Sequence, residues 1–166
     1  MWQATLVIIK PDAIKRGLIG ATLAHLEPLQ LEIIGVKVIR VSRDLAEKHY
    51  QNIREKPFFE ETVTYLQGKL HGVPSVLALV LAGEDAVERV RRITGATHPE
   101  KAEPTSIRGA LGRMKLDGLM ENVVHTSSDQ AEALREIKLW FSPHELLRDP
   151  SSGDSLERRA AISTTS

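Results

Sequence analysis

The sequence predicts an α+β fold in which four strands, in the order βαββαβ, form one antiparallel sheet with helices packed on one face. Two observations lead to this prediction. Apolar, β-branched runs alternate with stretches of helical periodicity, and a long aperiodic loop precedes the last strand. The chain has 166 residues, which suffice for one domain with a substantial core and leave little room for a second.

The first half of the chain supplies two strands. Residues 5–9 form a continuous apolar run, which is typical of a strand buried on both faces, and Lys10 follows at its carboxyl end. We expect a helix over about residues 21–29, where leucines recur three apart. A second strand is expected over residues 33–41, where Gly35 indicates a bulge or a bend.

Two short helices are expected next, the first opened by Asp44 in a pattern that resembles a capping box. Residues 75–81 form the third buried strand, and a helix then runs to about Ile93. Residues 94–112 hold three glycines and two prolines without periodicity, and so long a loop in a compact domain is usually functional.

The fourth strand is expected over residues 122–125 and a closing helix over residues 130–141. The resulting βαββαβ order is the ferredoxin-like, or split βαβ, arrangement. Residues 1–147 then form the domain, and the polar residues 148–166 form a mobile C-terminal tail.

Composition excludes several classes of protein. Lys+Arg and Asp+Glu both total 22, so no overall positive field indicates nucleic acid as the main partner. The absence of cysteine excludes disulfides, thiol catalysis and cysteine-based zinc sites. The N-terminus shows no signal-peptide pattern and the longest apolar run, residues 76–82, is too short to span a bilayer. We therefore expect a cytoplasmic protein that does not associate with membranes.

A group of cations is the first candidate site. Lys10 ends the first strand, Arg91 and Arg92 precede the long loop, and Thr97 and Arg108 lie within it. Guanidinium groups match phosphate oxygens in pairs, which favours a phosphate-binding role. For any one of these residues, ordinary solvated surface charge is the more frequent explanation.

His125 is the second candidate, because it ends a strand beside the positive end of a helix, where a phosphate binds well. A neutral imidazole is nucleophilic, and Glu136 could fix its tautomer, although a solvated glutamate is the alternative. Phe58, after a proline, could stack on a nucleotide base, whereas core packing is the ordinary role of a phenylalanine.

Seven motifs in this order resemble nucleoside diphosphate kinase, and the match extends from about residue 4 to residue 147. The motifs are Lys10–Gly20, His49-Tyr50, Lys56–Phe59, Thr94–Pro99, Ser106–Gly109, Asn122–His125 and Arg135–Phe141. The resemblance implies a ping-pong transfer of the γ-phosphate of a nucleoside triphosphate to a nucleoside diphosphate through a phosphohistidine at His125, with little base specificity.

The resemblance also implies roles for individual residues. Glu136 would orient the histidine ring with Ser127 beside it, and Mg²⁺ would be carried mainly by the nucleotide phosphates, without a dedicated protein metal site. The partners would be nucleoside di- and triphosphates and further copies of the chain, in a hexamer or a tetramer. The implied substrate contacts are Lys10, Arg91, Thr97 and Arg108 on the phosphates, Phe58 on the base, Asn122 and Lys10 on the sugar hydroxyls, and Tyr50 in support of the lysine.

The sequence departs from the family pattern in five places. Thr126–Asp129 replaces the usual small residue, serine and aspartate, so we expect the helix cap to be rebuilt there. Insertions of about four residues fall around residues 69–72 and within residues 111–121, the second beside the expected nucleotide pocket. His98 and Thr105 also differ from the family. A catalytically weak nucleotide-binding module and an oligomeric scaffold are the alternative functions, and a scaffold would not need this set of charged residues.

Overall fold

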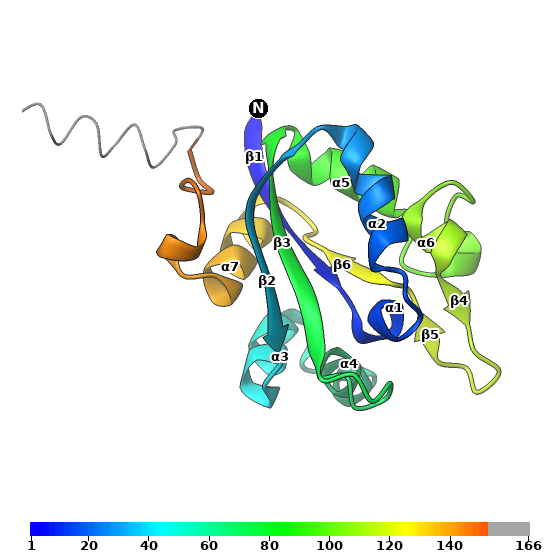
Figure 1. Cartoon of the computed structure of the whole chain (residues 1–166). Coiled ribbons are helices and arrows are strands. Elements are labelled where there is room, and N and C mark those ends of the chain that lie inside the picture. Colours follow the sequence, from blue (N-terminus) through cyan, green and yellow to red (C-terminus); the bar gives the residue numbers. More distant parts are fainter. Residues whose placement is uncertain (153–166) are drawn as a thin grey trace, which may run out of the picture.

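The computed structural model describes residues 1–152, which are built around one four-stranded antiparallel sheet (Figure 1). Its strand order is β2-β3-β1-β6, so β1 is a central strand between β3 and β6. The order and the antiparallel pairing confirm the predicted ferredoxin-like α+β fold. The four strands are β1 (Trp2–Ile9), β2 (Glu32–Arg40), β3 (Ser75–Glu84) and β6 (Val124–Thr126).

Helices cover both faces of this sheet, which corrects the prediction of one covered face. The crossover helices α2 and α5 share one face, where they pack around Val7 and Ile9 of β1. Helices α3, α4 and α7 pack on the other face around Leu6 and Ile8. Because successive side chains of β1 alternate between two apolar faces, both faces must be covered. The helices are α1 (Pro11–Lys15), α2 (Ile19–Leu26), α3 (Arg43–His49), α4 (Phe59–Leu66), α5 (Ala86–Thr94), α6 (Ile107–Leu111) and α7 (Gln130–Trp140).

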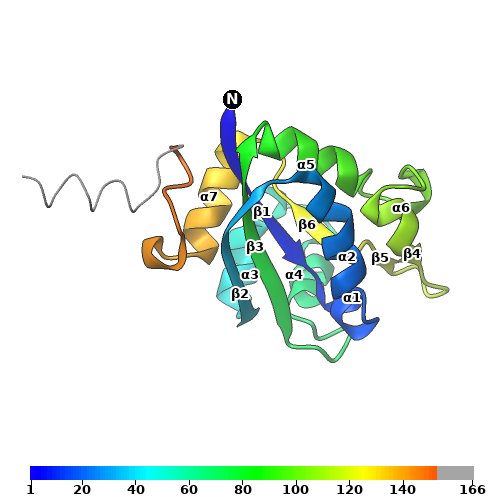
Figure 2. The ribbon, with the colours of Figure 1, turned by 45° about the horizontal axis from the view of Figure 1, so that its top comes forward.

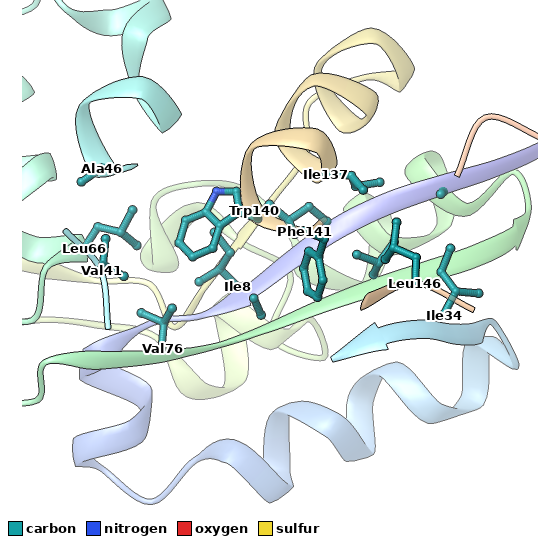
Figure 3. Close-up of a cluster of buried hydrophobic side chains, with 14 of the residues drawn as sticks. Ile8, Ile34, Val41, Ala46, Leu66, Val76, Ile137, Trp140, Phe141 and Leu146 are labelled. Atoms are coloured by element: carbon teal, nitrogen blue, oxygen red, sulfur yellow. The ribbon is translucent and has the colours of Figure 1, made fainter. Parts of the chain in front are cut away.

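The core under α7 positions the closing helix against the central strand. Ile137, Trp140 and Phe141 from the carboxyl-terminal half of α7 and its end pack with Ile8 and Val76 of the sheet (Figure 3). All five are almost entirely buried. This packing fixes the rotation of α7, and therefore decides which of its polar side chains face the end of β6.

Two local predictions are wrong for identifiable reasons. The side chain that caps α3 is that of Ser42, which accepts a hydrogen bond from the Leu45 backbone N–H (3.1 Å), and not that of Asp44. The loop predicted for residues 94–112 contains the short helix α6, capped by Ser106. A helix of five residues completes too few turns to leave a periodic pattern in the sequence.

The second insertion forms a hairpin that was not predicted. Strands β4 (Arg113–Met114) and β5 (Met120–Glu121) pair antiparallel and project at one end of the molecule (Figure 2). Elsewhere in the sheet, the predicted irregularity at Gly35 is confirmed, since the register of β2 and β3 shifts between Ile33 and Gly35.

The start of the predicted C-terminal tail lies against the domain. The Leu147 backbone N–H donates to the carbonyl of Ile34 (2.8 Å), and Arg148 forms an ion pair with Glu32 (2.9 Å). The rest of that predicted tail, residues 153–166, lies outside the described residues. Among residues 1–152, no helix is both long and apolar enough to cross a membrane.

Strand β2 forms an edge of the sheet that exposes apolar side chains. Val36 is 57% and Val38 71% exposed, and Ile33 is also exposed. They pair with Leu79, Leu77 and Leu81 of β3 and therefore share the face of α2 and α5, where no described side chain covers them fully. An unpaired strand edge with apolar side chains is a site where another chain can add.

Candidate active site

A single cavity of about 450 Å³ collects most of the residues singled out in the sequence. It lies where the ends of β1 and β6 meet α4, α5 and the loop before α6. Glu136 and Ser127 do not line it and are buried behind His125. The predicted residues that do line it are Lys10, Tyr50, Phe58, Arg91, Thr97, Arg108, Asn122 and His125.

His125 enters this cavity from a tightly specified corner of the chain. It lies opposite Ile8 in the pairing of β6 with β1. Two residues earlier, Val123 has a φ of 71°, a conformation that is strained for a β-branched residue. Buried bonds hold it there, since its N–H donates to Asp12 Oδ2 (3.1 Å) and its carbonyl accepts from the Lys10 N–H (2.9 Å).

The buried carboxylate of Glu136 determines which nitrogen of His125 carries the proton. His125 Nε2 lies 2.9 Å from Glu136 Oε1, and a carboxylate can only accept, so Nε2 carries the proton. Nδ1 then keeps its lone pair. The other oxygen of Glu136 accepts from the Ser127 hydroxyl (2.6 Å), which in turn accepts from the Leu6 N–H of β1 (3.2 Å).

His49 is a functional candidate to which the sequence assigned no role. Its ring contacts that of His125 edge to face, with centroids 4.3 Å apart. Its Nδ1 accepts from the indole N–H of Trp140 (3.1 Å). Burial, followed by the nearby charges of His125, Arg135 and Lys10, lowers the pKa of His49 well below its ordinary 6.5. A neutral, immobile ring therefore packs against His125.

Lys10 is held beneath the cavity by an amide and an aromatic ring. Its ammonium group donates to Asn122 Oδ1, and Asn122 Nδ2 donates to the carbonyl of Thr97 (3.0 Å). The ammonium also lies over the ring of Tyr65, 4.6 Å from its centroid. Tyr50, from which the resemblance implied this support, packs its ring edge against His125 instead. The sequence assigned Tyr65 no role, because no local pattern indicates its contact with a lysine far earlier in the chain.

Two cations of the cavity lining, Lys10 and Arg108, have lowered pKa values. Burial, reinforced by the charge of Arg108, lowers the pKa of Lys10 to about 8. Burial likewise lowers the pKa of Arg108 to about 10, with a contribution from Arg91. Arg108 is fixed by donating to the carbonyls of Gly95 (3.2 Å) and Val124 (2.8 Å). Crowded, partly dehydrated cations of this kind favour binding of a polyanion.

Arg92 lies outside the cavity, and Asp129 caps α7. Arg92 pairs with Glu88 on α5 (2.7 Å) and does not line the cavity. The altered Thr126–Asp129 segment still caps α7, because Asp129 Oδ1 accepts from the Glu132 N–H (2.9 Å). The displaced aspartate thus takes the capping position itself, and Ser127 is left free to bond Glu136.

The site can bind a flat ring together with a chain of phosphates. Phe58 lines the cavity, is 51% exposed and offers a face for stacking. Among the described side chains that line the cavity, Glu61 is the one carboxylate. The ligand atoms of His49, His125 and Glu136 also lie within 4.8 Å of one another, but two imidazoles do not suit Mg²⁺, which prefers oxygen.

Comparison with known proteins gives the family. The family model described as nucleoside diphosphate kinase matches residues 3–146. The chain belongs to the nucleoside diphosphate kinase family. Relatives that bear this name are 45% identical in Pyrococcus horikoshii (92% of this chain and 93% of the relative) and 43% identical in a strain of Thermus thermophilus (87% and 99%).

Solved structures of nucleoside diphosphate kinases share the fold. The Halobacterium salinarum enzyme in complex with CDP has a TM-score of 0.79 at 36% identity, covering 91% of this chain and 97% of that one. The Borrelia burgdorferi enzyme, a transition-state mimic with vanadate and ADP, has a TM-score of 0.79 at 32% identity, covering 89% and 92%. This member of the nucleoside diphosphate kinase family is therefore an enzyme of nucleotide phosphate transfer.

The serine behind the histidine supplies a test of the site's construction. Ser127→Ala removes partners from Glu136 and from the Leu6 N–H, both buried, so the free energy of unfolding should fall by about 1–3 kcal/mol. Ser128→Ala is the matched control, since its exposed hydroxyl bonds only Asp129, and the change should stay within about 0.5 kcal/mol. Urea denaturation measures both. Equal stabilities of the two variants would contradict the assigned network.

Proposed function

We propose that this enzyme transfers the γ-phosphate of a nucleoside triphosphate to a nucleoside diphosphate by a ping-pong mechanism through a phosphohistidine at His125. The observation that carries the proposal is the tautomer of this residue. Because Nε2–H is bonded to buried Glu136, the lone pair of Nδ1 is the available nucleophile in a cavity lined by three cations.

In the first half-reaction, His125 Nδ1 attacks the γ-phosphorus of the triphosphate. The N–P bond forms as the bond from phosphorus to the bridging oxygen breaks, and the electron pair leaves on the nucleoside diphosphate. In the second half-reaction, a terminal oxygen of an incoming nucleoside diphosphate attacks the same phosphorus and the N–P bond breaks. Glu136 keeps Nε2 protonated throughout and stabilises the positive ring, while Ser127 holds Glu136.

The cavity lining divides into contacts for the phosphates, the sugar and the base. Arg91, Arg108 and Thr97 would bind the phosphates together with Lys10, since phosphoryl transfer needs positioning and charge neutralisation above all. Asn122 and Lys10 would bind the sugar hydroxyls. Phe58 would stack on the base, and the small dependence of stacking on the identity of a base accounts for broad specificity.

Mg²⁺ is proposed to enter with the nucleotide. The lining offers Glu61 as its one carboxylate, which is too few oxygen ligands for a dedicated magnesium site within residues 1–152. Bound to the phosphate oxygens, the ion would neutralise charge that develops during transfer.

The nucleophile is tested by labelling. Incubation with [γ-³²P]ATP alone should label the protein through an acid-labile, base-stable bond, because a phosphoramidate resists base and not acid. His125→Asn should abolish labelling, whereas His144→Asn, on an exposed turn outside the cavity, should leave it unchanged. Full-rate labelling of His125→Asn would refute the assignment. Labelling without transfer to dTDP would favour a weak nucleotide-binding module.

Lys10 gives the binding reaction a pH dependence. Its pKa of about 8 lies below the ordinary 10.5, so the free enzyme has largely lost this proton at about pH 9, and a bound phosphate restores it. ADP binding should therefore take up close to one proton at about pH 9 and much less at about pH 7, with affinity falling as the pH rises through about 8. Calorimetry in buffers of different ionisation enthalpy measures the uptake, with Lys138→Met, exposed on α7, as control. Absence of uptake at the higher pH would contradict this role.

We also propose a homo-oligomer, a hexamer or a tetramer, in which the edge of β2 meets a second copy. The support is the row of exposed apolar side chains on that strand. Light scattering at micromolar concentration should give a multiple of the 18.4 kDa chain mass. Val38→Lys should lower that mass, and Leu116→Lys, at the exposed tip of the β4–β5 hairpin, should not. A monomeric wild-type chain would contradict the proposal.

A further inference from the structure

A buried carboxylate next to the sugar-side asparagine is not used by the mechanism above. Glu121 ends β5 and directly precedes Asn122, and its side chain is only 3% exposed. Three cationic or hydrogen-bonding groups surround it: Arg113 Nε (2.6 Å), His71 Nε2 (3.1 Å) and Arg16 Nη1 (3.8 Å). A carboxylate with this many partners fixes the groups around it.

The partners of Glu121 come from segments far apart in the sequence. Arg113 and Glu121 belong to the hairpin formed by the second insertion (Figure 2). His71 belongs to the first insertion, after α4, and Arg16 follows α1. Both segments that the sequence indicates as insertions therefore meet at one side chain, close to the cavity that Met120 of the hairpin lines.

Two routes lead from this carboxylate to Lys10. Along the chain, the next residue is Asn122, whose amide oxygen accepts from the Lys10 ammonium group. Across space, the ring of His71 packs against that of Tyr65, with centroids 4.8 Å apart, and the Lys10 ammonium lies over the same Tyr65 ring. Both residues proposed to bind the sugar hydroxyls are thus positioned from Glu121.

Hydrogen bonds from Arg113 and His71 keep the carboxylate of Glu121 charged and hold it in place. Burial alone would raise the pKa of Glu121, but the hydrogen bonds from Arg113 and His71 outweigh that effect and the pKa is lowered. Removing the charge would leave Arg113 and Arg16 without their shared ionic partner. It would also weaken the contact of Glu121 with His71, which joins the hairpin to the first insertion.

We propose that Glu121 is a positioning residue for the nucleoside, which joins the two insertions and thereby sets Asn122 and Lys10 against the sugar hydroxyls. The inference rests on the proposed function, because it assumes that His125 receives the phosphoryl group of a nucleotide. It extends that function by assigning recognition of the sugar to a contact between two insertions, away from the reacting atoms.

The test measures single-turnover labelling of His125 by three donors: ATP, 3′-deoxyATP and phosphoramidate. The ratio of the ATP rate to the 3′-deoxyATP rate reports the sugar contact, and phosphoramidate, which has no sugar, reports the nucleophile. Glu121→Gln should raise the KM for ATP roughly tenfold, because displaced positioning groups lose much of their contribution. The ATP to 3′-deoxyATP ratio should fall at least about threefold, as expected for coupled groups.

Two further variants make the result decisive. Arg113→Gln affects a half-exposed side chain and should fold even if Glu121→Gln does not, and it should lower the ratio in the same direction by a smaller factor. Glu145→Gln is the matched control, since this glutamate is also ion-paired, to Lys37, far from the cavity, and its ratio should equal that of the wild type. Phosphoramidate labelling should fall much less than ATP labelling in Glu121→Gln and Arg113→Gln, since of the displaced groups only Lys10 would contact phosphate, and it should stay at the wild-type rate in Glu145→Gln.

The outcomes separate this inference from the proposed function. An unchanged ATP to 3′-deoxyATP ratio in Arg113→Gln and in folded Glu121→Gln, with phosphoramidate labelling intact, would overturn the positioning role. An equal loss with all three donors would overturn it as well, because a merely structural defect acts on every donor alike. If none of the three donors labelled the wild-type protein, the phosphohistidine mechanism itself would be refuted.

Discussion

The active site depends on one buried carboxylate. Glu136 is almost fully inaccessible, yet both of its oxygens are bonded, one to His125 and one to Ser127. Ser127 is in turn bonded to Leu6, so a chain of hydrogen bonds connects His125 to the central strand of the sheet. A buried charge is stable only with such partners, and the same partners decide the tautomer on which phosphoryl transfer would rely.

The central strand β1 positions both Lys10 and His125. β1 lies between β3 and β6, is apolar on both faces and is covered by helices on each. Lys10 follows its last residue, and its partner strand β6 presents His125 opposite Ile8. The distance between cation and nucleophile is therefore set by strand pairing, which deforms far less than a loop. Val123, whose backbone is strained, connects the end of β1 to the start of β6, because its N–H donates to Asp12 and its carbonyl accepts from the Lys10 N–H.

The buried cations of the cavity, Lys10 and Arg108, are destabilised in their charged forms, and a bound anion would stabilise them. Burial lowers the pKa values of Lys10 and Arg108, and the charges of Arg108 on Lys10 and of Arg91 on Arg108 lower them further, while Asp12 opposes the shift at Lys10. Glu61 is the one carboxylate among the described residues that line the cavity. A polyphosphate supplies the missing negative charge, so part of the affinity for a nucleotide would come from removing this repulsion. The buried carboxylate of Glu121 differs from these cations, because Arg113 and His71 already balance its charge within the protein.

By itself, the sequence determined the α+β class, the approximate positions of the four strands of the main sheet and eight of the residues that line the cavity, because apolar periodicity is local and the motifs keep their order along the chain. Tertiary structure alone decided that helices cover both faces, that Ser42 caps α3 and that residues 113–121 form a hairpin. It also decided that Tyr65, and not Tyr50, lies under Lys10. The coverage of both faces and the position of Tyr65 depend on the rotation of packed helices and on contacts between residues far apart along the chain, which no local pattern records. The Ser42 cap and the hairpin are short-range features, but Asp44 offered a competing cap residue and the strands of the hairpin have only two residues each.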